Sequence, residues 1–167
     1  MIKLINGRGQ LGTSLNALVK AYKGTEVIYI YHTWNFIDKR QHIQEEEYNK
    51  FKKFVNEHKD KKIVFISTRS NNGDNYVKYK LLSEAYLLEN CKTGIIIRMC
   101  NLVGKGICNK LSDGCFPYGN IELSTIENVS EEIITILNLK HDKFLFNITG
   151  DYIDAKTIQK LVMFNKL

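Results

Sequence analysis

A tyrosine and a lysine four residues apart, Tyr76 and Lys80, are the strongest candidates for chemistry in this sequence. In a helix, this spacing places both side chains on one face. An ammonium group stabilises a phenolate, so we expect Lys80 to lower the pKa of Tyr76 from about 10 toward neutrality. The phenol could then exchange a proton with a substrate hydroxyl or carbonyl, while Ser67 or Thr68 hydrogen-bonds the same oxygen. The pattern indicates an oxidoreductase.

The sequence context separates this pair from a second one. Tyr48 and Lys52 have the same spacing, and a chain with nine tyrosines should contain about one such pair by chance. Only Tyr76 begins a predicted helix directly after an apolar strand that ends in two hydroxyl residues, Ser67 and Thr68. We therefore interpret Tyr48 and Lys52 as helix surface and assign the later pair to catalysis.

A glycine turn lies near the start of the chain, between a predicted strand at 2–5 and a predicted helix at 11–22. In a dinucleotide fingerprint the first glycine permits a tight turn, the second admits a pyrophosphate and the third allows close helix packing. The N–H groups at the helix N-terminus then face the anion. An ordinary strand-to-helix turn is the alternative. The expected cofactor-binding residues are Gly7, Arg8, Gly9, Gln10, Leu11 and Gly12.

The remaining sequence alternates strands and helices. Strands are expected at 26–31, 63–66, 94–99 and 144–148, and helices at 44–58, 76–90, 130–139 and from about 154, with a loop at 101–120. This pattern predicts one α/β domain over residues 1–167, with a doubly wound, mainly parallel, three-layer Rossmann-like sheet. Right-handed crossovers stepping in one direction would place every helix on one face. We therefore expect the strand order 2-1-3-4, with a ligand crevice between the first and third strands.

The end of the second predicted strand bears on the choice of cofactor. It reads Tyr31-His32-Thr33-Trp34, without the acidic residue that would bind an adenosine ribose. We expect His32 to line the cofactor pocket, although packing against the sheet is an alternative for His32 and Trp34. Three basic residues could bind a 2′-phosphate and thus favour NADP over NAD, unless they are simply solvated charges: Arg8, Lys39 and Arg40.

Composition excludes several other classes. The chain has 167 residues, 44% of them hydrophobic, and a net charge of +6 from scattered lysines, so we expect no nucleic-acid binding. No apolar run approaches the roughly 18 residues of a membrane span. The four cysteines lack metal-site or disulfide-framework spacing, which indicates no metal and reduced thiols in a cytoplasmic protein: Cys91, Cys100, Cys108 and Cys115.

Several segments together resemble the extended short-chain dehydrogenase/reductase family of sugar-nucleotide epimerases, dehydratases and reductases, in a shortened form. Tyr76-xxx-Lys80-xxx-Glu84 is similar to the family's active-site helix, and residues 97–106 to its Arg-Pro-x-Asn-x-x-Gly-x-Gly segment. Residues 125–133 and 146–150 are similar to later family segments. Residues 10–12 resemble the 4-dehydrorhamnose reductase branch.

The resemblance implies an NAD(P)-dependent enzyme that reduces or epimerises a nucleotide-linked sugar. It implies that Lys80 binds the nicotinamide ribose, that Asn101 and Arg69 contact substrate, and that the helices at 44–58 and 76–90 pair in a homodimer. The alternative is a catalytically degenerate nucleotide-binding or interaction protein of the same fold.

Overall fold

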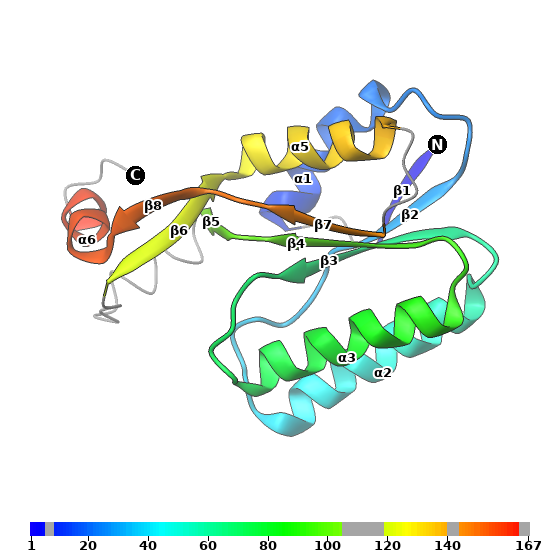
Figure 1. Ribbon diagram of the computed structural model, residues 1–167, viewed down its shortest axis with the longest axis horizontal. Helices are drawn as coiled ribbons and strands as arrows, with labels where there is room; N and C mark the ends of the chain where they lie inside the picture. Colours follow the sequence, from blue (N-terminus) through cyan, green and yellow to red (C-terminus); the bar gives the residue numbers. More distant parts are fainter. Residues whose placement is uncertain (6–8, 105–118, 140–143, 164–167) are drawn as a thin grey trace.

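The computed structural model describes residues 1–5, 9–104, 119–139 and 144–163. At its centre is a five-stranded parallel sheet in the order β1-β2-β3-β4-β7. Its strands are β1 (Ile2–Ile5), β2 (Ile28–Tyr31), β3 (Lys62–Thr68), β4 (Gly94–Met99) and β7 (Leu145–Ile148). The helices α1 (Gln10–Leu18) and α5 (Ile126–Asn138) cover one face, and α2 (Gln41–Glu57) and α3 (Asn75–Asn90) cover the other (Figure 1). The fold is α/β, three-layered and doubly wound, as predicted.

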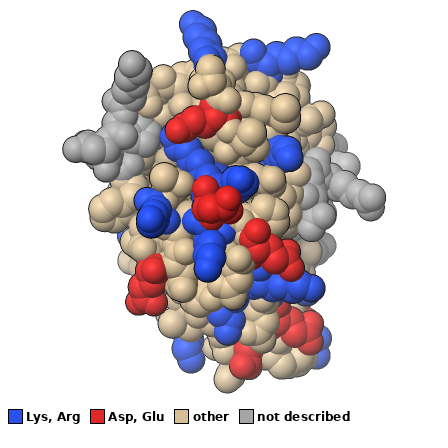
Figure 2. Space-filling model, turned by 90° about the vertical axis from the view of Figure 1, so that its right-hand side faces the viewer, with Lys and Arg blue, Asp and Glu red and all other residues tan. Residues whose placement is uncertain are grey.

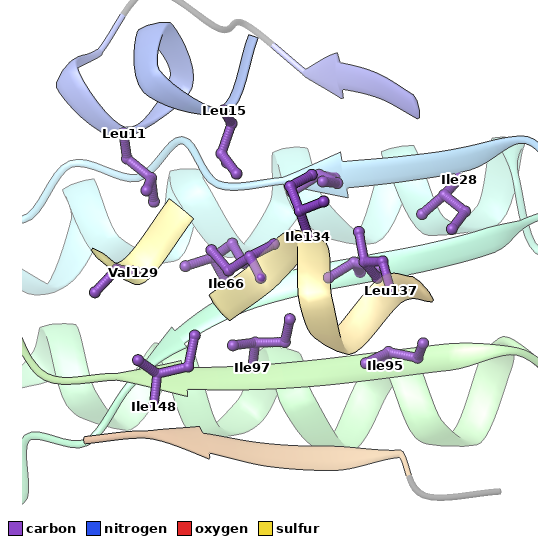
Figure 3. Packing of buried hydrophobic residues seen from close by; sticks show 13 residues of the cluster. Leu11, Leu15, Ile28, Ile66, Ile95, Ile97, Val129, Ile134, Leu137 and Ile148 are labelled. Atoms are coloured by element: carbon purple, nitrogen blue, oxygen red, sulfur yellow. The ribbon is translucent and has the colours of Figure 1, made fainter. Parts of the chain in front are cut away.

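The alternation of side chains along each strand explains why both faces need helices. Ile28, Ile30, Val64 and Ile66 belong to the cluster beneath α1 and α5. Figure 3 shows Ile28 and Ile66 in this layer with Leu11 and Leu15 of α1 and Ile134 and Leu137 of α5. Three of their sequence neighbours, Tyr31, Ile63 and Phe65, point the opposite way and pack in the cluster beneath α2 and α3, together with Ile96 of β4. Strands that are apolar on both faces must be buried on both faces.

The predicted strand order 2-1-3-4 is wrong. β2 lies between β1 and β3, with Ile5 opposite Tyr31 and Tyr31 opposite Phe65. The connections through α1 and α2 step across the sheet in the same direction, yet the two helices lie on opposite faces, so the two crossovers have opposite hands (Figure 1). The prediction assumed that all crossovers share one hand. The point where neighbouring helices leave on opposite faces is therefore the crevice between β1 and β2.

A second, three-stranded sheet lies beyond the carboxyl end of β4. It contains β5 (Asn101–Val103), β6 (Asn120–Thr125) and β8 (Asp151–Asp154) in the order β5-β6-β8, followed by α6 (Ala155–Met163). The predicted loop at 101–120 thus contains β5 at one end, and no strand was predicted at 151–154. Both strands are short, and the small core of this sheet is centred on Leu123 and Ile158.

Gly150 makes the passage from β7 to β8 possible. A Cβ atom at this residue would lie 2.1 Å from the carbonyl oxygen of Leu123 and 3.0 Å from Sγ of Cys100. The backbone of β6 cannot yield to a side chain here, because Leu123 is buried in the second sheet. Only glycine allows the two sheets to approach this closely.

The surface and the helices add three findings. On the face in Figure 2, lysine and arginine side chains are interspersed with aspartate and glutamate. No helix within the described ranges is long and apolar enough to cross a membrane. In the same ranges, Cys91 and Cys100 are free thiols, and no group of three or more histidine, cysteine or acidic residues could hold a metal ion.

Candidate active site

Tyr76 lies in the first turn of α3, close to the carboxyl end of β3. Asp74 caps this helix by accepting a hydrogen bond from the backbone N–H of Val77 at 2.9 Å. The cap fixes the start of α3 directly after the short connection from Thr68. The Thr68 hydroxyl lies close enough to the Tyr76 phenol to act on its pKa in the lowering direction. Of the two hydroxyl residues predicted from the sequence, the structure therefore brings Thr68 to the phenol.

Lys80 follows one helical turn later, but its ammonium group points into the protein. The Nζ atom donates to the carbonyl oxygen of Ile66 at 2.7 Å and lies 4.5 Å from the ring centroids of both Trp34 and Phe65. Its distance to the Tyr76 ring centroid is 5.9 Å. Lys80 is only 3% exposed. The two aromatic rings and the carbonyl oxygen stabilise the ammonium in a site that excludes water.

The predicted pKa pattern is reversed in this structure. Burial raises the pKa of Tyr76 to about 12, with Thr68 acting in the opposite direction. Burial also lowers the pKa of Lys80 to about 7, with Glu84 and Glu47 acting in the opposite direction. The expectation that Lys80 lowers the Tyr76 pKa toward neutrality is wrong here, because desolvation is the largest influence on the pKa of both groups. At neutral pH the phenol is therefore protonated.

Ser67 belongs to a buried ionic cluster rather than to the reactive pair. Its hydroxyl donates to Oε1 of Glu84 at 2.5 Å. The guanidinium of Arg98 contacts both oxygens of the same carboxylate, with Nη2 2.6 Å from Oε2. Ser67 and Glu84 are 1% and 5% exposed. The cluster joins β3, α3 and β4 through one side chain of each element. It therefore helps to hold α3, the helix that carries Tyr76, against the sheet.

The described part of the glycine turn has the features of an anion site. Gly9 precedes α1 with a φ of −77°, a backbone conformation that does not require glycine. No side chain caps the N-terminus of α1. A Cβ atom at Gly9 would meet no atom within 4 Å. Leu11 and Gly12 are buried. The side chain of Gln10 packs on Gly104, because a Cβ atom added to Gly104 would lie 2.6 Å from Oε1 of Gln10. Gly7 and Arg8 lie outside the described residues.

Two polar atoms beside this turn lack partners. They are Nε2 of His32 and Oγ1 of Thr33, which are buried and make no hydrogen bond within the described structure. Burial lowers the pKa of His32, and the charge of Lys80 acts in the same direction, so the imidazole is neutral. Unpartnered buried donors and acceptors are costly. Together with the open space at Gly9 and the uncapped N-terminus of α1, they fit the phosphate and ribose of a nicotinamide nucleotide.

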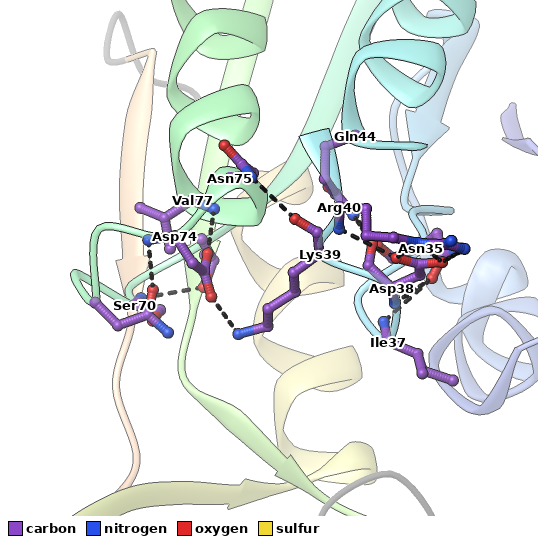
Figure 4. Close-up of polar contacts among 12 residues, drawn as sticks. Asn35, Ile37, Asp38, Lys39, Arg40, Gln44, Ser70, Asp74, Asn75 and Val77 are labelled. Carbon is purple, nitrogen blue, oxygen red and sulfur yellow. Dashed lines mark hydrogen bonds and ion pairs between the residues drawn. The ribbon is translucent and has the colours of Figure 1, made fainter. Parts of the chain in front are cut away.

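The two described cations expected to favour NADP are engaged elsewhere. Lys39 forms an ion pair with Asp74, and its Nζ lies 6.0 Å from the Tyr76 ring centroid. Arg40 pairs with Asp38 on the surface, with Nη2 2.6 Å from Oδ2. Figure 4 shows Arg40 and Asp38 on the connection that leads into α2, and Lys39 of this connection reaching Asp74 at the start of α3. The structure thus places Lys39 beside the candidate catalytic tyrosine.

The predicted substrate contacts, Arg69 and Asn101, lie where the two sheets meet. Nε of Arg69 donates to Oε2 of Glu122 at 3.0 Å, and Nδ2 of Asn101 donates to the carbonyl oxygen of the same residue at 3.2 Å. Oε1 of Glu122 accepts from the backbone N–H of Gly150 at 3.3 Å. Arg69 therefore helps to fix the second sheet against the end of β3, whereas Asn101 joins β5 to β6 within the second sheet.

Comparison with known proteins identifies the architecture. No protein-family model and no curated protein sequence matches the chain. A UDP-N-acetylglucosamine 4-epimerase from Bacillus cereus superposes with a TM-score of 0.72 at 13% identity, over 99% of this chain and 82% of the epimerase. A dTDP-4-dehydrorhamnose reductase from Clostridium acetobutylicum superposes with a TM-score of 0.69 at 15% identity, over 97% and 79%. The chain has the fold of the extended short-chain dehydrogenase/reductases.

A further solved structure of the extended short-chain dehydrogenase/reductase fold contains a cofactor. It is a dTDP-4-dehydrorhamnose reductase from Bacillus anthracis in complex with NADP, with a TM-score of 0.67 at 12% identity over 98% of this chain and 80% of that protein. The likeness concerns the fold, and the expected resemblance to this family is confirmed at that level.

Sequence reasoning missed two side chains that shape the site, Thr33 and Gln44, and it named Glu84 in a motif without predicting its contact with Ser67. Glu84 binds Ser67, and Thr33 carries an unpartnered hydroxyl. Gln44 is fully buried, accepts from the indole N–H of Trp34 at 2.7 Å and donates to the carbonyl oxygens of Asn35 and Asp38. Gln44 occupies a core-facing position of α2. A polar residue at such a position was the sequence signal that could have indicated a buried hydrogen-bonding role.

Proposed function

We propose that this protein is an NAD(P)-dependent oxidoreductase of the short-chain dehydrogenase/reductase type that reduces or epimerises a nucleotide-linked sugar. The observation that carries the proposal is the grouping at the carboxyl edge of the sheet, where β3 ends in Thr68, Tyr76 lies near its hydroxyl, and Nζ of Lys80 lies 5.9 Å from the Tyr76 ring centroid. The nicotinamide nucleotide, when bound, supplies or accepts a hydride.

The protein's own residues would handle the proton. The Tyr76 phenol, protonated at neutral pH because burial raises its pKa to about 12, donates to the carbonyl oxygen that becomes a hydroxyl. The Thr68 hydroxyl holds the same oxygen. This assignment favours the direction of carbonyl reduction, since the proton is already in place on the tyrosine.

The substrate class rests on the solved structures with this fold. Among them are a UDP-N-acetylglucosamine 4-epimerase and dTDP-4-dehydrorhamnose reductases. We propose a nucleotide-linked sugar for this chain too, with Arg69 and Asn101 at the entrance between the two sheets. Arg69 would bind a substrate phosphate only by sharing its guanidinium with Glu122.

The test begins with calorimetric titration of the protein with NADH and NADPH, beside Gly9→Asp, which places a carboxylate where a phosphate would lie. We expect micromolar binding that Gly9→Asp abolishes. Nucleotide sugars are then screened with the bound cofactor, and Tyr76→Phe should lower turnover by about 100-fold or more while cofactor affinity stays unchanged. Absence of binding by both reduced nucleotides would contradict the proposal.

One observation favours the alternative of a nucleotide-binding protein without catalysis. Lys80 donates to Ile66 and is enclosed by two aromatic rings, so its ammonium would have to leave these contacts to reach a bound ribose. The two functions differ in one result. The catalytic protein turns over a carbonyl substrate in a manner that depends on Tyr76, whereas the other binds the nucleotide without turnover.

A homodimer is part of the proposal. Three leucines on the outer side of α3 remain 40–45% exposed: Leu81, Leu82 and Leu88. Leu81 and Leu82 also line an open apolar hollow of about 450 Å³ together with Val77. Exposed leucines on one helix favour association with a second copy of the chain.

A further inference from the structure

The position of β1 at the edge of the sheet bears on how much of a dinucleotide the protein can hold. Among the strands in the described ranges, β1 pairs only with β2, and Ile5 lies opposite Tyr31 at the carboxyl end of both strands. His32 and Thr33 follow Tyr31 directly, so they lie beside the start of the glycine turn. The helices α1 and α2 leave this crevice on opposite faces (Figure 1).

A dinucleotide site in a doubly wound sheet has two halves, one on each side of the first strand. The half that holds adenosine uses the strand that follows the first helix, and an acidic residue at its end binds the ribose. In this protein the strand after α1 is β2, which lies on the side of β3 instead. β2 is followed by His32, and no described strand pairs with the other edge of β1.

The charged residues agree with this topology. The described cations nearest in sequence to the end of β2 are Lys39 and Arg40, which pair with Asp74 and Asp38 on the α2 and α3 side of the sheet. Neither is free to bind an adenosine ribose phosphate. The polar atoms without a hydrogen-bond partner in the described structure belong instead to His32 and Thr33, which follow directly after the end of β2 beside β1.

We infer that this site binds the nicotinamide ribose phosphate half of the cofactor, and that adenosine adds little to affinity because it lies beyond the edge strand β1. The inference rests on the proposed function and narrows it. Gly9 and the N-terminus of α1 receive phosphate, while Oγ1 of Thr33 and Nε2 of His32 bind the ribose or the carboxamide.

The test compares reduced nicotinamide mononucleotide, NADH and AMP by titration calorimetry with the full chain. We expect the dissociation constant of the mononucleotide to lie within about tenfold of that of NADH. AMP at millimolar concentration should not compete with NADH for binding. Thr33→Val keeps the shape of the side chain and removes the unpartnered hydroxyl. The Thr33→Val variant should lower the affinities for the mononucleotide and for NADH by the same factor, about threefold to tenfold, without lowering the Tm. Thr135→Val, on the exposed side of α5, is the matched control and should leave both affinities unchanged.

The outcomes separate this inference from the proposed function. If NADH binds at least about 100-fold more tightly than the mononucleotide, or if AMP displaces NADH, adenosine has its own site and the inference is wrong while the proposed function stands. Unequal losses with Thr33→Val, or none, would also overturn it. If none of the three compounds binds, both the inference and the proposed function fail.

Discussion

Ser67 and Thr68 are adjacent in the sequence, yet their hydroxyl groups serve different partners: Ser67 donates to Glu84 at 2.5 Å, and Thr68 meets Tyr76. The pleat of β3 causes this division, because successive side chains of a strand point to opposite sides. One residue stabilises the helix that carries the phenol, and the next faces the phenol itself.

We predict that Ser67→Ala and Thr68→Val have separable effects. Ser67→Ala should lower the free energy of unfolding by about 1–2 kcal/mol, since Glu84 loses one donor but keeps Arg98. Thr68→Val should reduce turnover by about 100-fold with a smaller effect on stability. Urea unfolding and single-turnover assays measure the two quantities. A larger loss of turnover in Ser67→Ala than in Thr68→Val would reverse the assignment.

Lys80 should make the stability depend on pH. Its pKa is about 7 when folded, against 10.5 for the ordinary side chain, so the unfolded chain binds more protons between these values. Because of Lys80, the free energy of unfolding should therefore increase as the pH rises, by about 1 kcal/mol per pH unit between pH 7.5 and 9.5. Urea unfolding across this range should show the slope in the wild type.

Two lysine variants isolate that slope. Lys80→Met removes the titrating group and should flatten the profile, whereas Lys78→Met, at an exposed position of the same helix, should retain it. An unchanged slope in Lys80→Met would show that another group is responsible. The measurement stays below pH 10, where ionisation of Tyr76 in the unfolded state would begin to act in the opposite direction.

Two glycines should respond oppositely to alanine. Gly150→Ala should destabilise the protein by about 1–3 kcal/mol, because the new Cβ meets the backbone of Leu123. Gly9→Ala should leave the Tm unchanged or slightly higher, because φ is −77° and the space is open, yet it should weaken NADH binding. Thermal unfolding and calorimetry test both. Equal affinity for NADH in Gly9→Ala would argue against phosphate binding at this turn.

Substitution on α3 should abolish self-association. The double variant Leu81→Glu, Leu82→Glu introduces like charges at the centre of the proposed dimer face, and sedimentation velocity should detect a monomer where the wild type is a dimer. Leu139→Glu is a suitable control, since Leu139 is 58% exposed at the end of α5 on the other face of the sheet. A monomeric wild type at high concentration would contradict the homodimer.

The elements of the main sheet were predictable because their signals are local. The run at Gly94–Met99 was predicted with the observed bounds, and the helix with Tyr76 and Lys80 was predicted from residue 76 against an observed start at Asn75. Apolar strands covered on both faces and a helix capped by Asp74 carry strong patterns. Strand order depends instead on the hand of a crossover, which no short segment encodes.

The candidate site was predictable in residue types but not in side-chain directions. The sequence placed Ser67, Thr68, Tyr76 and Lys80 at one end of the sheet. It could not reveal that Ser67 donates to Glu84, whose carboxylate also binds Arg98. The pKa values of Tyr76 and Lys80 depend on burial by the β2–α2 connection, which Gln44 holds in place. Those contacts arise only when distant segments pack together.

The edge strand β1 also links ligand binding to local unfolding. It has four residues and one neighbour, and the glycine turn begins directly after it. Strands with a single partner open at lower free energy than central strands, so the amide hydrogens of Ile2–Ile5 should exchange with solvent before those of β3. A nucleotide held by the turn stabilises the closed form in proportion to its binding free energy. Slower exchange in β1 would then report occupancy of the site, even for a ligand that undergoes no reaction.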